Sequence, residues 1–209
     1  MIRQILWVLN QTAAECRRVP DPDLDPDLDL EAGGLHEPLH LRCSGGTYLS
    51  WFPHAYPFFS GVRGWTDARA KYAPSHVMDR IPAGSGSYVI VIHLYMHFSQ
   101  AHTAVYALHA RDTARAVRRV LDRNPGVRVF IRGPHAVGGN MYCLAGDYHA
   151  ERCLRVLREE FRGLRDRVFF LNTWDMTVAN ENYDIHPSLE TVKAVTRLML
   201  SNVCSPDQL

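Results

Sequence analysis

The chain has 209 residues, of which 46% are hydrophobic and 22% charged, and its formal net charge is +1 at pH 7. This length suits one globular domain with a sizeable core, so we expect residues 1–209 to fold as a single domain. A charge so close to zero gives no electrostatic basis for binding nucleic acid or an anionic membrane. No apolar run reaches the roughly 18 residues of a transmembrane helix. The N-terminal segment lacks the pattern of a signal peptide, because Asn10 and Gln11 interrupt its short apolar stretch.

The cysteines bear on both metal binding and compartment, and they stand at Cys16, Cys43, Cys143, Cys153 and Cys204. They form no Cys-x-x-Cys pair and no zinc-type His/Cys group, so we expect no metal site. The glycines of 133–139 do not form a dinucleotide-binding motif, and no other cofactor is predicted. In an oxidising compartment five cysteines leave one unpaired within the chain, whereas in the cytosol all five stay reduced. The sequence leaves both states open.

The first half of the chain combines short regular segments with loops. Residues 1–18 have the apolar spacing of an amphipathic helix. Residues 20–34 alternate Asp with Pro and Leu, which predicts an acidic surface loop because proline forbids a helix there. Residues 39–43 and 47–51 alternate as the two strands of a hairpin, with Ser44-Gly45-Gly46 as its turn.

The second half repeats a pattern of strand and helix. Apolar runs predict buried strands at 87–95, 127–131 and 168–171. Amphipathic periodicity predicts helices at 103–123, 147–162 and 188–203. In the first of these helices we expect the inward side chains to be Ala107, Leu108, Ala114, Val117, Val120 and Leu121, and in the last Leu189, Val192, Val195, Leu198, Met199 and Val203.

This alternation is typical of an α/β fold, and we expect a three-layer α/β/α sandwich around a mainly parallel sheet. The crossover connections are expected to be right-handed. A parallel sheet of only three strands is thin. We therefore expect the hairpin region to supply an edge strand and the first strand of the fold to be missing.

The segment 168–187 carries the candidate site. Its apolar strand is followed at once by a polar loop, which closes on His186-Pro187 before the last helix. Folds of the α/β class place reactive side chains at the carboxyl ends of their strands, and a loop histidine with acids nearby is a candidate general base. The alternative is structural. In that interpretation Asp184 or Asn182 caps the helix, Pro187 lies in its first turn, and His186 is only packed there.

Several motifs, taken in chain order, resemble the neurexophilin and PC-esterase (NXPE) family. They are His54-Ala-Tyr-Pro-Phe58, the apolar strand ending Met96-His97-Phe98, Val129-Phe-Ile-Arg132, Trp174-Asp-Met-Thr with His186-Pro, and the closing Leu200-Ser-Asn-Val-Cys204. Together they cover nearly the whole chain. The resemblance implies the C-terminal domain of that family, which is a member of the SGNH/GDSL hydrolase superfamily.

The resemblance also implies a missing N-terminal block. In such proteins the domain opens with Gly-Asp-Ser, followed shortly by Arg-Gln, and the Ser is the nucleophile. This chain starts Met1-Ile2-Arg3-Gln4, so the Gly-Asp-Ser and the strand before it are expected to be absent. That implies a truncated product, an incomplete gene model or a naturally inactive member of the family.

The family pattern assigns roles to residues that match it here. His186 matches the histidine of a C-terminal Asp-x-x-His and is the expected general base. Tyr183 stands where the acid belongs, so Asp184 or, alternatively, Asp175 is left to orient the imidazole. His97 matches a family histidine and either supports the site or is simply packed.

Tyr95 stands where relatives have Gly in Gly-Gln-His-Phe, which puts a donor of the expected oxyanion hole in doubt. We therefore do not assign that donor to a residue of this chain.

The resemblance implies an acyl-esterase or O-acetyltransferase acting on an ester of a glycan or glycoprotein, in the secretory pathway lumen or outside the cell. Without the nucleophilic Ser, this chain is expected to be inactive by itself. One alternative is a non-catalytic module that binds a glycan or protein through Trp51, Phe58 and Trp174. Another is an unstable fragment with an exposed sheet edge. The acyl group and the oligomeric state are not predicted.

Overall fold

The computed structural model describes residues 16–19, 39–52, 73–84, 87–98, 101–138, 146–182 and 184–203. Its elements divide into two compact units, Met1–Val77 and Met78–Leu209, and each is described by itself. The predictions made for residues 1–15, for the acidic loop 20–34 and for His54-Ala-Tyr-Pro-Phe58 lie outside the described residues. That residues 1–209 form a single domain stays a prediction.

The first unit holds a small antiparallel sheet of β1 (Cys16–Arg18), β2 (Leu39–Cys43) and β3 (Tyr48–Trp51), in that order. The hairpin β2–β3 is confirmed, and a tight turn over Ser44–Gly46 joins its strands. Both glycines of this turn have φ +77°, a conformation that costs glycine little because it has no Cβ. The predicted helix is wrong for residues 16–18, which pair with β2 instead.

A disulfide joins Cys16 to Cys43, which are partners in the register of β1 and β2. This pairing decides, for these two residues, the question that the sequence left open. Cys153 is a free thiol buried in the second unit, and Cys143 and Cys204 lie outside the described residues.

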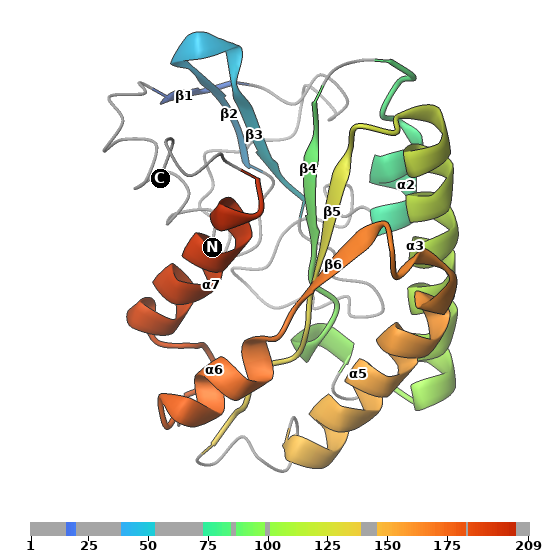
Figure 1. The fold of residues 1–209 in the computed structure, drawn as a ribbon. Helices are drawn as coiled ribbons and strands as arrows, with labels where there is room; N and C mark the ends of the chain where they lie inside the picture. Colours follow the sequence, from blue (N-terminus) through green and yellow to red (C-terminus); the bar gives the residue numbers. More distant parts are fainter. Residues whose placement is uncertain are drawn as a thin grey trace, which may run out of the picture. The chain divides into compact units, whose positions relative to one another are not determined.

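The second unit is built on a parallel sheet with the order β4–β5–β6 (Figure 1). Its strands are β4 (Val89–Ile92), β5 (Arg128–Arg132) and β6 (Val168–Leu171), which confirms the three predicted strands. The hairpin pairs only with β1 among the described strands. The expectation that it supplies an edge strand to the parallel sheet is therefore wrong for this part of the chain.

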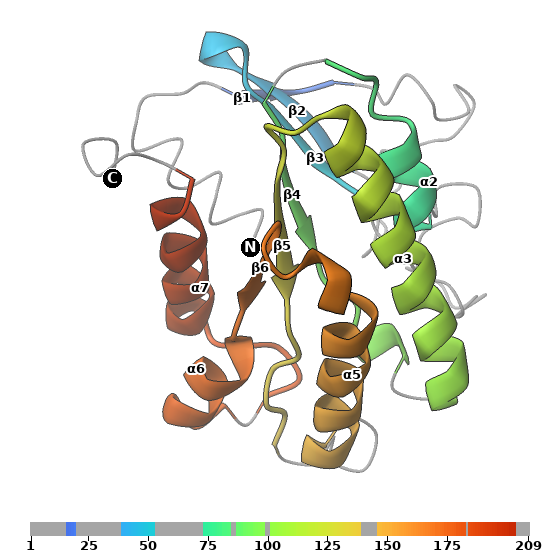
Figure 2. The ribbon, with the colours of Figure 1, turned by 45° about the vertical axis from the view of Figure 1, so that its right-hand side comes forward.

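Helices lie on both faces of the parallel sheet (Figures 1 and 2). On one face are α3 (Thr103–Arg123) and α5 (Asp147–Glu160), and on the other α7 (Leu189–Ser201) with α6 (Thr173–Ala179) beside it. The expected α/β/α layering is confirmed. Three short elements complete the described chain, namely α2 (Pro74–Asp79) and the 3-10 turns Met96–Phe98 and Arg162–Leu164.

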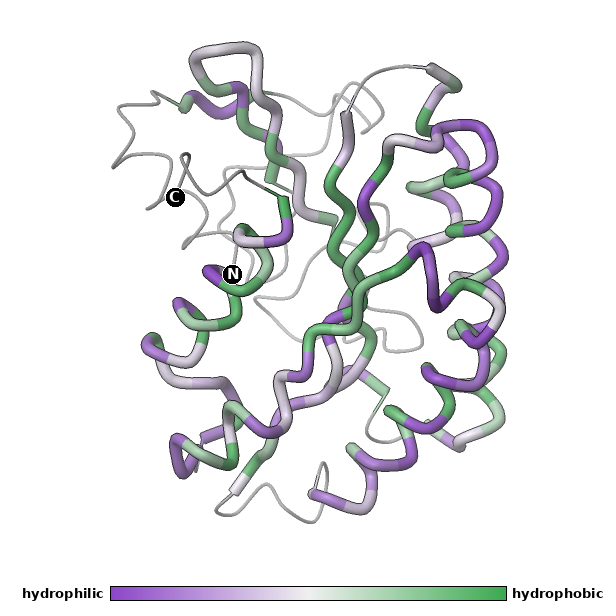
Figure 3. The backbone as a smooth tube through the Cα atoms, in the orientation of Figure 1, coloured by the Kyte–Doolittle hydropathy of each residue, from purple (hydrophilic) through white to green (hydrophobic). Residues whose placement is uncertain are grey.

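The core of the second unit lies between the sheet and the α3–α5 layer. Apolar residues run along the strands, while polar and apolar residues alternate along the helices (Figure 3). The buried cluster joins the inward faces of both helices to residues of the strands. It includes Val117 of α3 and Leu157 of α5, together with Ile92, Val129 and Val168 of the strands. Burial of these side chains is the main favourable contribution to folding of this layer.

Two details of the helices differ from the predictions. Leu108 of α3 and Leu189 of α7 were expected to point inward, but their exposed fractions are 63% and 55%. Residues 173–179, which the sequence predicted to be loop, form α6. Its N-terminus is capped because the Asn172 side chain accepts a hydrogen bond from the amide of Asp175.

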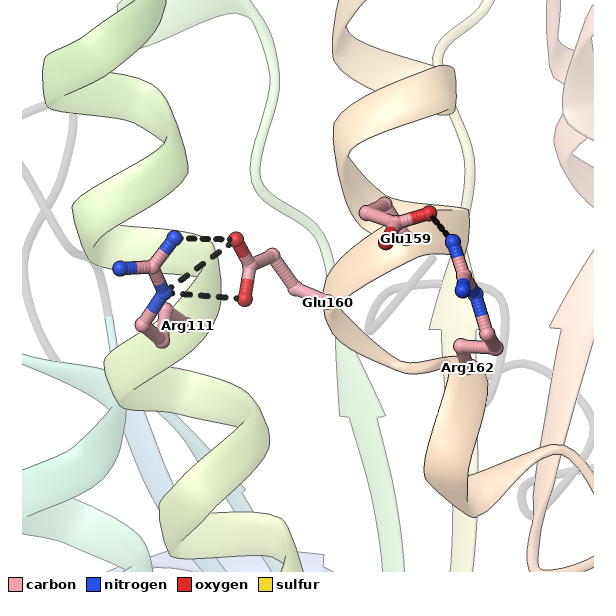
Figure 4. Close-up of polar contacts among 4 residues, drawn as sticks. All are labelled: Arg111, Glu159, Glu160 and Arg162. Atoms are coloured by element: carbon pink, nitrogen blue, oxygen red, sulfur yellow. Dashed lines mark hydrogen bonds and ion pairs between the residues drawn. The ribbon is translucent and has the colours of Figure 1, made fainter.

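An ion pair on the surface joins the two helices that cover the core (Figure 4). Arg111 of α3 donates through Nε and Nη2 to both carboxylate oxygens of Glu160 of α5, at 2.9–3.3 Å. A second pair, Arg162 with Glu159, stays within one stretch of chain. Exposed pairs of this kind add little to stability, so packing holds α3 against α5 and the ion pairs follow from it.

Truncating a core leucine tests this account of the α3–α5 layer. Leu157→Ala should lower the free energy of unfolding by about 2–5 kcal/mol, because the side chain is fully buried and leaves a cavity. The same change at exposed Leu108 should cost no more than about 0.5 kcal/mol. Urea denaturation followed by circular dichroism measures both. Equal effects would show that Leu108 is buried after all.

The cysteines give a chemical test. Burial raises the pKa of the Cys153 thiol to about 12, so almost no reactive thiolate forms near neutral pH. Iodoacetamide should therefore leave Cys153 unmodified in the folded protein and alkylate it once the protein is unfolded. A non-reduced digest analysed by mass spectrometry should contain the peptides of Cys16 and Cys43 joined together. Rapid labelling of native Cys153, or unlinked peptides, would contradict the structure.

Candidate active site

The three parallel strands end at the same edge of the sheet, toward the lower part of Figure 1. His93 follows β4, His135 lies three residues after β5, and Asn172 follows β6. The carboxyl edge of such a sheet is where α/β folds form their sites. The segment that carries His186 contacts this edge through hydrogen bonds to the loop after β5.

Asn182 holds two backbone segments together. Its side-chain amide donates to the carbonyl of Ala136, in the loop after β5, and to the carbonyl of Asp184, each at 2.8 Å. The amide of Ala136 in turn donates to Oγ1 of Thr177, a fully buried residue of α6, at 2.8 Å. The loop after β5 is thereby fixed to α6 and to the segment before His186.

His135 makes the closest connection to the predicted base. Its Nε2–H donates to the carbonyl of Ile185, the residue before His186, at 2.9 Å. A carbonyl can only accept, so Nε2 carries the proton and Nδ1 holds a lone pair. That Nδ1 is buried and has no hydrogen-bond partner among the described residues.

Burial of the His135 imidazole lowers its pKa to about 4. The hydrogen bond to Ile185 opposes this shift, while the nearby charges of Arg132 and His186 add to it. His135 is therefore neutral at physiological pH. It can hold the backbone of the loop without adding positive charge to the site.

Aromatic contacts with Tyr95 and His93 hold His135 in place. Its ring lies 5.2 Å from that of Tyr95 in an edge-on arrangement and 6.1 Å from that of His93 in a stacked one. Nδ1 of His93 donates to the carbonyl of Arg132 at 3.1 Å. Tyr95 is almost completely buried, at 1% exposed, and packs against His135.

The predicted site residues are only partly brought together. His186 and Asp184 are exposed in one bend, 184–186, which the hydrogen bonds above hold. Asp175 lies in the first turn of α6, where its carboxylate accepts a hydrogen bond from Asn172 at 2.5 Å. Within the described part of the chain, no hydrogen bond or ion pair joins His186 to either acid. The catalytic roles of these residues stay predictions, as does the supporting role of half-buried His97.

The structural alternative for this segment is corrected in one respect. The side chain that caps α7 is Ser188, whose Oγ accepts from the amide of Thr191, so neither Asp184 nor Asn182 is the cap. Pro187 precedes the helix and does not lie in its first turn. Asn182 instead joins the two loops of the site.

The sequence did not predict a role for His135, and for Asn182 it offered only that of a helix cap. The sequence did contain a signal for His135. Gly133-Pro134-His135 directly follows a buried strand, and the loop that leads to His186 also follows one, β6. Nothing in the spacing indicates that these two loops contact each other.

A small hollow borders the same edge of the sheet. Its volume is about 30 Å³, and its lining includes Gly133, Asn172 and Trp174. It has room for little more than a water molecule, so it does not enclose a ligand. Trp174 lines this hollow. Its predicted contact with a glycan stays a prediction.

Metal binding and membrane insertion each require features of their own. No group of three or more His, Cys, Asp or Glu side chains among them could hold a metal ion. None of the described helices is long and apolar enough to cross a membrane.

The low pKa of His135 predicts a pH-dependent stability. The unfolded chain binds a proton at this imidazole below about pH 6.5, whereas the folded protein does so only below about pH 4. Stability should therefore fall as pH drops from 6.5, with a loss of about 1–2 kcal/mol from this group at pH 5. Urea unfolding at several pH values measures the slope. His135→Gln keeps an amide donor and should remove this part of the slope, whereas an unchanged slope in the variant would contradict the assignment.

Comparison with known proteins gives a match to a protein family. A family model described as "NXPE family member 4-like, C-terminal domain" matches residues 25–204. No solved structure matches the chain significantly.

Proposed function

The chain belongs to the family of NXPE family member 4-like C-terminal domains, and from that premise we propose that it forms part of an SGNH-like acyl-esterase or acyltransferase. The substrate class we propose is an acyl ester of a glycan or glycoprotein. The family membership suggests a relationship to SGNH-like hydrolases and acyltransferases, and the residues below supply the chemistry.

His186 is the proposed general base. It would take the proton from a nucleophilic hydroxyl as that oxygen attacks the acyl carbonyl, and return it to the departing sugar oxygen. The acyl group then passes from the nucleophile to water in a hydrolase or to a second hydroxyl in a transferase. Asp184, or alternatively Asp175, would hold the imidazole in the required tautomer, and His97 would support the site.

The observation that carries this proposal is the anchoring of the bend 184–186 at the carboxyl edge of the parallel sheet. Asn182 and His135 bind the carbonyls of Asp184 and Ile185, and His186 stays exposed. A base must be accessible to substrate yet fixed in position. A histidine that served only packing would be buried, as His135 is.

The disulfide supports the proposed compartment. A Cys16–Cys43 bond persists where the environment is oxidising, as in the secretory pathway lumen or outside the cell, and is rare in the cytosol. A glycan ester is available in the same compartments. Localisation there is part of the proposal.

A non-catalytic binding module is the second candidate. The observation that favours it is that no hydroxyl forms a hydrogen bond with His186 within the part of the chain that the structure describes. In that case the edge of the sheet binds a glycan or protein partner and no acyl transfer follows.

Turnover of an acyl ester separates the two. Because this chain is expected to lack the nucleophilic Ser, it should not hydrolyse 4-nitrophenyl acetate by itself. With the Gly-Asp-Ser segment of a relative fused before Met1, hydrolysis should appear, and His186→Ala in this fused chain should lower kcat/KM by at least about 100-fold because proton transfer is lost. His76→Gln, a change at an exposed histidine of α2 outside the proposed site, should leave kcat/KM unchanged. If the fused chain turns over no faster than its His186→Ala variant, the enzyme proposal fails and the binding module is favoured.

A further inference from the structure

Arg132, at the end of the central strand, has no acidic partner among the residues that the structure describes. It is the last residue of β5 and is part-buried. Its Nε is enclosed and makes no hydrogen bond, and Arg132 forms no ion pair with any described residue. Burial lowers its pKa to about 10, so it still carries its positive charge at neutral pH.

Other arginines of the same unit are satisfied. Arg128, on the same strand and the same face, donates to the carbonyls of Asn202 and Val203 at 2.8 and 2.7 Å. Arg167 pairs with the carboxylate of Asp122 at 3.1 Å. Both have direct protein acceptors, whereas Arg132 has none among the described residues.

An arginine that is withdrawn from water needs an anion or several acceptors to offset the lost hydration. Proteins rarely bury this group unpaired. A position that keeps such a charge therefore needs a reason beyond folding. The reason has to lie in what reaches Arg132 from outside the described chain.

Among the described residues, the ionisable side chains that interact with Arg132 are histidines. Its own carbonyl accepts from His93, and its charge lowers the pKa of His135, which also responds to His186. Three imidazoles and one guanidinium thus lie at this edge of the sheet. The acids in the same region are engaged or exposed, since Asp175 is bound by Asn172 and Asp184 lies in the exposed bend.

We propose that Arg132 binds an oxyanion group of the ligand, a carboxylate or a sulfate or phosphate ester, beside His186. The planar fork of the guanidinium is suited to two parallel hydrogen bonds to such a group. This inference rests on the proposed function in one respect, namely that the ligand is an acyl ester. Binding of the anion itself can be measured without turnover.

Anion titration of the natural chain is the first test. The chain is labelled with ¹⁵N-arginine, and the Nε–Hε resonance of Arg132 is followed by NMR as sodium acetate or sodium sulfate is added against a sodium chloride reference of equal ionic strength. We expect a saturable shift with acetate, sulfate or both, and a rise in the pKa of His135 because the bound anion offsets the charge of Arg132. The stronger of the two anions identifies a planar carboxylate or a tetrahedral ester as the natural group.

Variants make the assignment specific. Arg132→Gln and Arg132→Lys should each weaken anion binding by at least about tenfold, since the first loses the charge and the second the fork. Arg128→Gln, the matched control on the same strand, should leave it unchanged. Absence of a saturable shift at Arg132, or an equal shift at Arg128, overturns the inference.

Stability gives an independent readout that does not depend on any anion. Because an unpaired part-buried charge disfavours folding, Arg132→Met should raise the urea midpoint of unfolding in anion-free buffer. A lowered midpoint would assign Arg132 a structural role and count against the inference.

The fate of the proposed function is separable. In the chain completed with the Gly-Asp-Ser segment, His186→Ala should abolish ester turnover and keep anion binding at Arg132. Anion binding without any His186-dependent turnover leaves the inference standing and removes the enzyme. His186-dependent turnover with no anion binding supports the enzyme proposal and overturns the inference about Arg132.

Discussion

The hydrogen bond from Nε2–H of His135 to the carbonyl of Ile185 is the constraint on which the site depends. It joins the loop after the central strand β5 to the bend that presents His186, although the two are 50 residues apart in the sequence. The imidazole can make this bond and stay neutral because burial holds its pKa near 4. The sheet edge and the bend therefore act as one rigid surface.

Two costs are concentrated at this edge of the sheet. Nδ1 of His135 and Nε of Arg132 are enclosed without partners among the described residues, and each such group opposes folding. The α3–α5 layer offsets them, since its core buries large apolar side chains such as Leu121 and Leu157. In many proteins the scaffold is stabilised by packing, whereas the functional site carries polar groups that oppose folding. Here the packing lies on one face of the sheet and the unsatisfied groups lie at its edge.

The sequence predicted the parts of the fold that depend on local pattern. The hairpin, the three parallel strands and α3 follow from periodicity, and α3 has the predicted bounds. The exposure of Leu108 could have been predicted, because it stands nine residues before buried Val117, about half a turn around the helix, so the helical period places it on the outer face. Residues 173–179 were predicted to be loop because the chain turns polar directly after the strand. The local signal for α6 was missed, since Asn172 stands three residues before Asp175 and caps the helix. The candidate base His186 was found from its position, whereas its anchor His135 was missed because the contact is long-range.

The most direct measurement of this account is an NMR correlation across the hydrogen bond between His135 and Ile185. With the chain labelled uniformly in ¹⁵N and ¹³C, the account predicts a slowly exchanging Nε2–H on His135 and a scalar coupling from its nitrogen to the carbonyl carbon of Ile185. An imidazole protonated at Nδ1, or one whose Nε2–H exchanges as fast as that of a free histidine, would contradict it. The bend with His186 would then be unanchored, and the basis for treating this edge of the sheet as an active site would be lost.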